Sequence, residues 1–113
     1  MRDMNFIFNP ELYYENERSL HKQLLGYRSI SQDYRRWRRE EWIYDEDHSI
    51  AWEKDLPLGF MIMLIYDCNT HLYELYLMDP DGEGQYSSPL FRDDHDPLLW
   101  AIYDYIINRF KEL

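Results

Sequence analysis

The sequence is short of cysteine, of glycine and of long apolar runs, and each shortage excludes a class of protein. Cys68 is the only cysteine, so no intramolecular disulfide can form, and a reducing compartment is the natural setting. The four glycines are scattered and form no phosphate-binding loop. The longest apolar run, residues 58–66, is far shorter than the roughly 18 residues of a membrane-spanning helix. Because the N-terminus also lacks a signal-peptide apolar region, we expect a cytoplasmic protein that does not associate with membranes.

Basic residues are scarce after Arg39. Residues 1–39 hold eight Lys or Arg and five Asp or Glu, a net charge of +3, whereas residues 40–113 hold four and seventeen, a net charge of −13. The whole chain carries −10 and has a pI of about 4.7. A surface of this sign repels phosphate backbones and attracts basic partners. We therefore expect a basic protein as the partner and no direct contact with nucleic acid.

Aromatic residues, by contrast, are abundant. Phe, Trp and Tyr make up 18% of the chain and apolar residues 45%. Side chains of this size supply enough contact area for a hydrophobic core, so disorder is not expected despite 30% charged residues. A chain of 113 residues fits one compact domain and leaves little room for a second. We expect residues 1–113 to form a single compact domain, with nothing in the sequence to set an oligomeric state.

Capping and turn residues predict two helices in the N-terminal part of the chain. Residues 4–8 are typical of a short strand or a packed arm. An Asn-Pro pair suited to a helix start predicts a first helix over about 10–25, with Gly26 as its stop. A Ser and a Gln at capping-box spacing predict a second helix over about 32–43. Residues 45–57 are highly charged and end in a proline, which predicts a loop or a short helical turn.

The C-terminal half changes to the patterns of strands, followed by one clear helix. Residues 58–67, 71–79 and 85–91 predict three antiparallel strands, because the intervening segments are rich in turn residues and one of them contains Asp-Gly. Asp96 and Pro97 are typical of an N-cap and a first helical position, and apolar residues recur after them at helical spacing. The predicted fold class is α+β: two N-terminal helices, a three-stranded antiparallel sheet, and a C-terminal amphipathic helix packed on it.

The segment 32–48, QDYRRWRREEWIYDEDH, reverses its charge within a few residues. On a helix, Arg36 and Glu40 lie four residues apart and Arg38 and Glu41 three apart, so local ion pairs are expected. A tryptophan among arginines, such as Trp37, also occurs in proteins whose aromatic side chains stack on nucleic-acid bases. Three interpretations remain open, namely a solvated and internally paired face, a partner-binding face, and a nucleic-acid contact. The acidic charge of the rest of the chain favours them in that order.

No arrangement of residues predicts catalysis or a metal site. Residues 79–84 resemble the start of a calcium loop, but Leu90 stands where such a loop requires a bidentate carboxylate. The histidines lack the helical spacing of zinc ligands. Cys68 and His71 lie in a predicted turn rather than in a shielded site. We expect a non-enzymatic protein with no catalytic residues, no cofactor and no bound metal.

Carboxylates interleaved with Trp and Tyr remain as the candidate site, because charge accelerates association and aromatic side chains often dominate binding energy. Two patches are predicted. The first consists of Glu40, Glu41, Trp42, Asp45, Glu46, Asp47, Trp52, Glu53 and Asp55. The second consists of Asp79, Asp81, Glu83, Asp93, Asp94 and Asp96. An alternative interpretation is that these acidic residues only keep an aromatic-rich domain in solution.

The function predicted from these features is that of a small acidic inhibitor. In size and charge the chain resembles the DNA mimics and related inhibitors that viruses and bacteria direct at nucleic-acid-handling enzymes, although it shares no motif with them. We expect its carboxylates to stand in for phosphates on a basic, nucleic-acid-binding surface of a larger protein. An immunity protein that neutralises a cognate toxic nuclease would use the same electrostatics, and an acidic subunit of a cellular complex is a further alternative.

Overall fold

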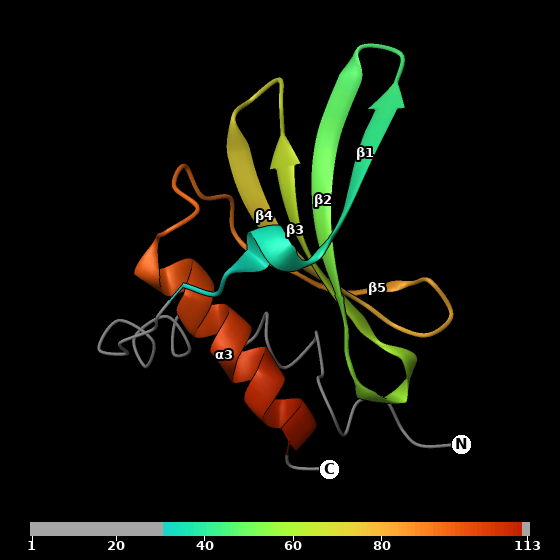
Figure 1. The fold of residues 1–113 in the computed structure, drawn as a ribbon, viewed down its shortest axis with the longest axis vertical. Helices are drawn as coiled ribbons and strands as arrows, with labels where there is room; N and C mark the ends of the chain where they lie inside the picture. Colours follow the sequence, from blue (N-terminus) through green and yellow to red (C-terminus); the bar gives the residue numbers. More distant parts are fainter. Residues whose placement is uncertain (1–30, 112–113) are drawn as a thin grey trace.

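The computed structural model describes residues 31–111, which form one antiparallel sheet with a single helix against one of its faces (Figure 1). The strands are β1 (Arg38–Tyr44), β2 (Asp47–Asp55), β3 (Met61–Asp67), β4 (Leu72–Met78) and β5 (Gly84–Ser87). The helix is α3 (Pro97–Lys111), and two short 3-10 turns are η2 (Tyr34–Arg36) and η3 (Pro57–Gly59). The strands lie in the order in which they occur along the chain, so each pairs with its neighbours in sequence.

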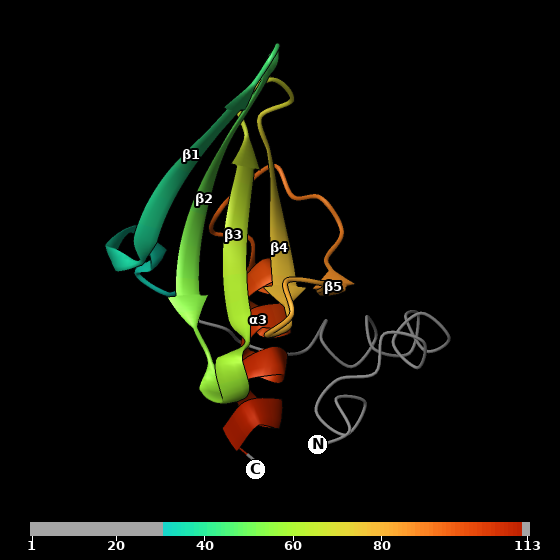
Figure 2. The same cartoon turned by 90° about the vertical axis from the view of Figure 1, so that its right-hand side faces the viewer.

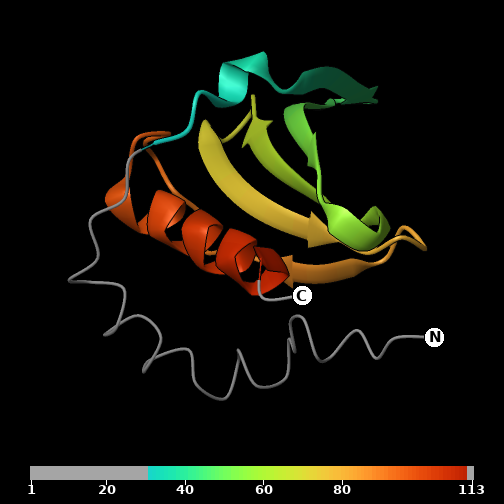
Figure 3. The ribbon, with the colours of Figure 1, turned by 60° about the horizontal axis from the view of Figure 1, so that its bottom comes forward.

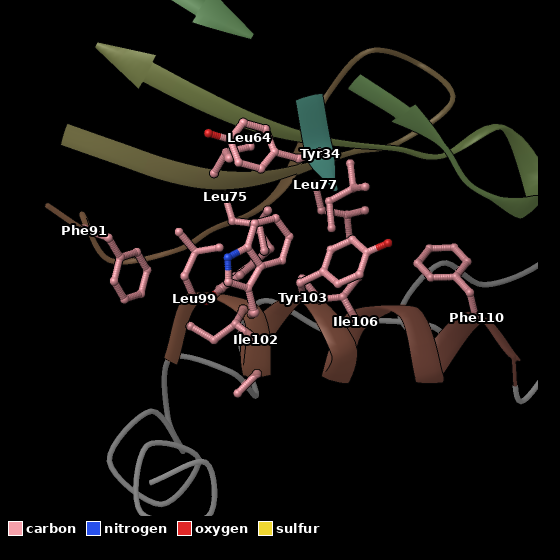
Figure 4. Close-up of a cluster of buried hydrophobic side chains, with 14 of the residues drawn as sticks. Tyr34, Leu64, Leu75, Leu77, Phe91, Leu99, Ile102, Tyr103, Ile106 and Phe110 are labelled. Carbon is pink, nitrogen blue, oxygen red and sulfur yellow. The ribbon is translucent and has the colours of Figure 1, made fainter. Parts of the chain in front are cut away.

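The core lies between the central strands and α3. Because side chains alternate between the two faces of a strand, Ile62 and Leu64 of β3 share a face with Leu75 and Leu77 of β4, and all four are fully buried. The helix side of this core is drawn in Figure 4. It consists of Leu99, Trp100, Ile102, Tyr103, Ile106 and Phe110. We call the sheet face that α3 covers the inner face and the opposite one the outer face (Figure 3).

Helix α3 begins as its sequence predicts. The carboxylate of Asp96 accepts a hydrogen bond from the backbone N–H of Leu98 at 2.9 Å, and Pro97 occupies the first helical position. Arg109 and Lys111 lie in the last turn, where positive charge complements the helix dipole. The predicted C-terminal helix and its packing on an antiparallel sheet are therefore confirmed.

An aromatic layer extends the core from η2 across to the helix. The Tyr34 ring stacks on Trp100, with centroids 5.9 Å apart, and meets the edge of Trp52 of β2 at 5.0 Å. Trp37 stacks on Tyr103 at 5.5 Å. Trp37 therefore packs on the core side of the chain, which favours the structural interpretation of this residue over base stacking.

The prediction of a second helix over residues 32–43 was wrong. Only Tyr34–Arg36 form a 3-10 turn, and Arg38–Tyr44 form strand β1. The local pairs expected on that helix are accordingly absent: Arg36 contacts Asp33 at 2.9 Å, while Arg38 reaches across to β2. Arginine and glutamate favour helices in isolation, but pairing of β1 with β2 over seven residue pairs outweighs that preference here.

The sheet is also larger than predicted. Asp47–Asp55, expected to be a loop or helical turn, form strand β2, so the sheet has five strands rather than three. The three predicted strands correspond to β3, β4 and β5, with shorter bounds than expected. The first predicted helix and the arm at residues 4–8 lie outside the described residues.

Candidate functional site

The β1–β2 hairpin presents one strand that is exposed along its whole length. All seven residues of β1 are exposed, and the hairpin extends past the part of the sheet that α3 covers (Figures 1 and 2). A two-residue turn joins its strands, since Tyr44 pairs with Asp47. Asp45 has a φ of 53°, a left-handed conformation that Asp and Asn tolerate better than most residues do.

The tip of this hairpin is acidic, and no cation among the described residues neutralises it. Asp45, Glu46 and Asp47 are exposed, and within residues 31–111 no Lys, Arg or His contacts their carboxylates. The side chain of Asn69, in the turn between β3 and β4, donates a hydrogen bond to the backbone carbonyl of Glu46 at 2.9 Å. This bond holds the two turns at one end of the sheet together, and we call Asp45–Asp47 the acidic tip.

Apolar side chains lie beside the acidic tip. Trp42 is 39% exposed, Ile43 69% and Tyr44 76%. The indole N–H of Trp42 donates to Glu40 at 3.1 Å, which fixes the ring on the outer face. Trp42 was among the predicted site residues, whereas Ile43 and Tyr44 were not. Their position immediately before a hairpin turn would have indicated exposure if the hairpin itself had been recognised.

Glu40 and Glu41 are exposed but already engaged within the hairpin. Glu41 accepts from Arg39 at 2.7 Å and lies 3.3 Å from His48, and these contacts hold its pKa below the usual value. The pKa of Glu40 is lowered chiefly by the hydrogen bond from Trp42. Both carboxylates remain ionised and accessible, at the sides of the hairpin rather than at its tip.

The other predicted residues of the first patch are structural in this fold. Trp52 packs on Tyr34 in the core. Glu53 is only 6% exposed, and its carboxylate lies 3.0 Å from the guanidinium of Arg38. The same guanidinium lies 3.2 Å from the carboxylate of Asp55. Burial raises the pKa of Glu53, while the contact with Arg38 lowers that of Asp55. Arg38 thus ties β1 to β2, which agrees with the structural interpretation of the arginine cluster.

The second predicted patch is divided between two places. Asp79, Asp81 and Glu83 lie in the turn that follows β4, whereas Asp93–Asp96 follow Phe91, which bridges to Tyr73 at the start of β4. The two groups therefore lie at opposite ends of a strand about 20 Å long. They do not form one continuous surface.

Several residues of this second set have structural roles. Asp79 is buried and accepts bonds from the backbone N–H groups of Asp81 and Glu83 and from the side chain of Gln85. Asp94 accepts a short hydrogen bond from the Tyr34 hydroxyl, and Asp96 caps α3. Asp93 accepts from the backbone of His95. Exposed carboxylates without a described cation remain at Asp81, Glu83 and Asp93, and the first two lie at the end of the sheet away from the acidic tip.

A hollow on the outer face adjoins the hairpin. Its volume is about 280 Å³, and both apolar and acidic side chains line it. The lining residues are Ser49, Ile65, Asp67, Thr70, Leu72, Glu74 and Leu90. Ser49 lies directly across from Trp42 and from Asp67 in the sheet, so the hollow lies next to Trp42 on the same face. Sequence reasoning missed Asp67 and Glu74, because nothing in the local pattern indicates that they border one hollow.

Neither metal chemistry nor a known relative assigns a role to this surface. Among residues 31–111, no three His, Cys, Asp or Glu side chains are placed to hold a metal ion. No helix in the same range is long and apolar enough to cross a membrane. Comparison with protein families, with curated proteins and with solved structures found no match. Any functional conclusion therefore depends on the geometry and charge of the chain itself.

Proposed function

We propose that this protein is a non-enzymatic acidic binding protein that occupies a basic, nucleic-acid-binding surface of a larger protein. The observation that carries the proposal is the unneutralised acidic tip of the β1–β2 hairpin. Elsewhere in the described chain most carboxylates have a partner, such as Arg38 for Glu53 and Asp55, or a helix N-terminus for Asp96. Those of the acidic tip have none within residues 31–111 and face solvent, where they can meet cations of another molecule.

The electrostatic surroundings of the tip strengthen this interpretation. Between Arg39 and Arg92 the only basic residue is Lys54. Its ammonium group donates to the Tyr103 hydroxyl at 2.7 Å and lies over the rings of Trp37 and Tyr103, on the inner side of the sheet. The outer face and the hairpin thus present negative charge that Lys54 does not screen. Such a field accelerates association with basic surfaces and weakens with added salt.

The apolar residues beside the acidic tip supply contact area, which charge alone does not provide. Trp42 and Tyr44 alternate with Ile43 along β1, so the first two lie on the outer face. Exposed aromatic side chains are the usual anchors of protein interfaces. The neighbouring hollow has apolar walls and two carboxylates, which suit the aliphatic stem and cationic head of an Arg or Lys side chain.

A charge-reversal pair tests the proposal. The protein is immobilised and exposed to a nuclease-treated lysate of its cells of origin at about 0.05 M and 0.5 M salt, and retained proteins are identified. The triple variant D45K/E46K/D47K should lose the captured partner. The matched variant D81K/E83K/D93K makes the same change in net charge away from the tip and should retain it.

A second measurement separates occupation of a nucleic-acid site from other acidic binding. The captured partner is purified and loaded with labelled duplex DNA or RNA, and this protein should displace the label whereas the tip variant should not. Capture of proteins that are not basic, or retention of the nucleic acid in the presence of saturating protein, would contradict the proposal. A nuclease partner whose cleavage is blocked would identify the immunity-protein form of the same function.

A further inference from the structure

The outer edge of β1 is an unpaired strand edge in the described structure. The strand order is β1-β2-β3-β4-β5, so β1 has a partner on one side only, and Figure 2 shows it at the margin of the sheet. All of its side chains are exposed and its register with β2 has no bulge. Natural proteins usually shorten, twist or cover such an edge, because it offers backbone hydrogen bonds to another strand.

The hydrogen bonds of β2 show which backbone groups of β1 face outward. The carbonyl of His48 accepts from the backbone N–H of Cys68 at 2.9 Å, so His48 points toward β3. Residues of a strand alternate in this respect, and Ser49 and its odd-numbered neighbours in β2 therefore point toward β1. Their partners in β1 have even numbers. It follows that the N–H and C=O groups of Arg39, Glu41 and Ile43 face outward.

We propose that this edge pairs with the same edge of a second copy, which makes a two-fold symmetric dimer with one continuous sheet. Symmetric antiparallel pairing requires a two-fold axis perpendicular to the sheet. The pairing must then be centred on one residue that faces its own copy. This requirement reduces the possible registers within β1 to a few that can be compared by charge.

Only one of these registers pairs most of β1 without opposing like charges. Centres at Arg39, Glu40 and Glu41 each place a charged residue opposite itself, which destabilises strand pairing. A centre at Ile43 or Tyr44 leaves at most three residues of each β1 paired, because β1 ends at Tyr44 and Asp45 and Glu46 form the turn. A centre at Trp42 instead stacks the two Trp42 rings.

The register centred on Trp42 is complementary at the positions around it. Glu40 then faces Tyr44 of the second copy, and Arg39 lies beside the turn residue Asp45, whose charge is opposite. Glu41 and Ile43 face each other and exchange backbone bonds through the groups that point outward. Exposed Trp42, Ile43 and Tyr44 become partly covered, which accounts for apolar residues at the margin of an acidic sheet. Both copies of α3 lie on the same face of the joined sheet, because the axis is perpendicular to it.

This register uses Trp42, Tyr44 and Asp45, so the dimer and a basic partner compete for the same residues. Concentration tests the dimer in the absence of that partner. The interface is small, so we expect a monomer at about 1 μM and a dimer as the main species near 1 mM, by sedimentation or light scattering. Glu41→Pro removes an outward N–H without removing a bond to β2, and it should raise the dissociation constant at least about 10-fold. Glu41→Gln keeps that N–H and should leave the dimer intact.

Charge exchange tests the register. Arg39→Asp and Asp45→Lys should each weaken the dimer, because each places like charges opposite one another twice. An equimolar mixture of the two variants should recover a heterodimer, in which both contacts join opposite charges. Arg92→Asp and Asp81→Lys, which make the same changes off the edge, should leave the dimer unchanged.

A cysteine scan over residues 39–43 in a Cys68→Ser background gives an independent readout. At the two-fold centre, non-hydrogen-bonded Cα atoms lie about 4.5 Å apart, within the range that a disulfide spans. Oxidation should therefore link Trp42→Cys into a dimer. Glu40→Cys should not link, since its two copies would lie about 13 Å apart along the strands. A protein that stays monomeric near 1 mM, or cross-linking strongest at another position, would overturn the proposal.

Discussion

The hydroxyl of Tyr34 donates a hydrogen bond to the carboxylate of Asp94, sixty positions further along the chain. This contact joins η2, which leads into β1, to the loop that leads into α3. Asp94 also accepts, through its backbone carbonyl, the indole N–H of Trp100 at 2.6 Å. The start of the hairpin and the start of the helix are thus fixed to each other at one buried point, and β1 leaves this point toward solvent.

Tyr34→Phe should therefore destabilise the protein although it removes a single oxygen atom. The variant leaves the largely buried carboxylate of Asp94 without its hydroxyl donor, and a loss of about 1–2 kcal/mol in the free energy of unfolding is expected. Tyr105→Phe removes a partly exposed hydroxyl and should change stability by less than about 0.5 kcal/mol. Denaturant unfolding of both variants measures the difference. Equal stabilities would show that the Tyr34 bond contributes nothing.

The ionisation of Tyr34 gives the same contact a signature at high pH. Burial, together with the neighbouring Asp94 carboxylate, raises the pKa of Tyr34 to about 12. The folded state therefore holds this proton more tightly than the unfolded chain, and the associated stability is lost as pH rises from about 10 toward 12. Wild-type protein should lose stability relative to Tyr34→Phe across this range. A difference that does not vary with pH would contradict the assignment.

Glu53→Gln should change how stability depends on pH above about pH 4. Burial raises the pKa of Glu53, with Arg38 partly opposing it, so the folded protein favours the protonated carboxyl. The wild type should therefore lose stability relative to E53Q as pH rises from about 4 through the raised folded pKa. Unfolding curves at several pH values between about 4 and 7 measure this trend.

Asp55→Asn is a control for Glu53→Gln, because the pKa of Asp55 is shifted in the opposite direction. Arg38 lowers the pKa of Asp55, so the stability that this carboxylate contributes is lost as pH falls below about 4. The stability of wild type relative to D55N should accordingly fall as the pH becomes acid, whereas its stability relative to E53Q should rise. Parallel curves for all three proteins would show that neither carboxylate has a shifted pKa.

Asp79→Ala should loosen the turn between β4 and β5. The substitution leaves two backbone N–H groups and the Gln85 amide without their acceptor, which is expected to cost about 1–3 kcal/mol. Hydrogen exchange should accelerate at Asp81 and Glu83. Asp81→Ala removes a carboxylate of the same turn that accepts no described bond, and its exchange rates should stay close to those of the wild type.

Leu75→Ala tests the core between the sheet and α3. Leu75 is fully buried among helix and sheet side chains, so a loss of about 2–5 kcal/mol is expected from lost burial and an unfilled cavity. Leu90→Ala makes the same change at a side chain that is 59% exposed and should cost less than about 0.5 kcal/mol. Comparable losses at both positions would be inconsistent with the described core.

The sequence predicted those elements whose determinants are local. Asp96 and Pro97 start α3 by their own chemistry, and apolar residues at helical spacing continue it. Strands β3 and β4 were recognised because their apolar residues are contiguous and are separated by a turn. Strands β1 and β2 were missed because their identity depends on pairing with each other. The contact of Arg38 with Glu53 spans fifteen positions, and no local pattern reveals it.

The same reason limits what the sequence could indicate about the site. It placed the acidic residues after Arg39 in a candidate surface, and the structure presents three of them, Asp45–Asp47, at one exposed tip. It could not separate these from Asp79, which is buried in its own turn, or from Glu53, which is buried and contacts Arg38 of the opposite strand. Nor could it show Ile43 and Tyr44 as exposed, because apolar residues in sequence are ordinarily assigned to the core.

The order of the strands has a consequence for how the molecule forms. Each strand pairs with the one synthesised immediately before it, so the sheet can grow by successive short loops, each with a small closure entropy. Its inner face, however, is covered by α3, which follows all five strands in the chain. Until α3 has left the ribosome, Leu64, Leu75 and their neighbours lack their cover. We therefore expect the nascent sheet to be a binding target for chaperones, and its release from them to coincide with synthesis of α3.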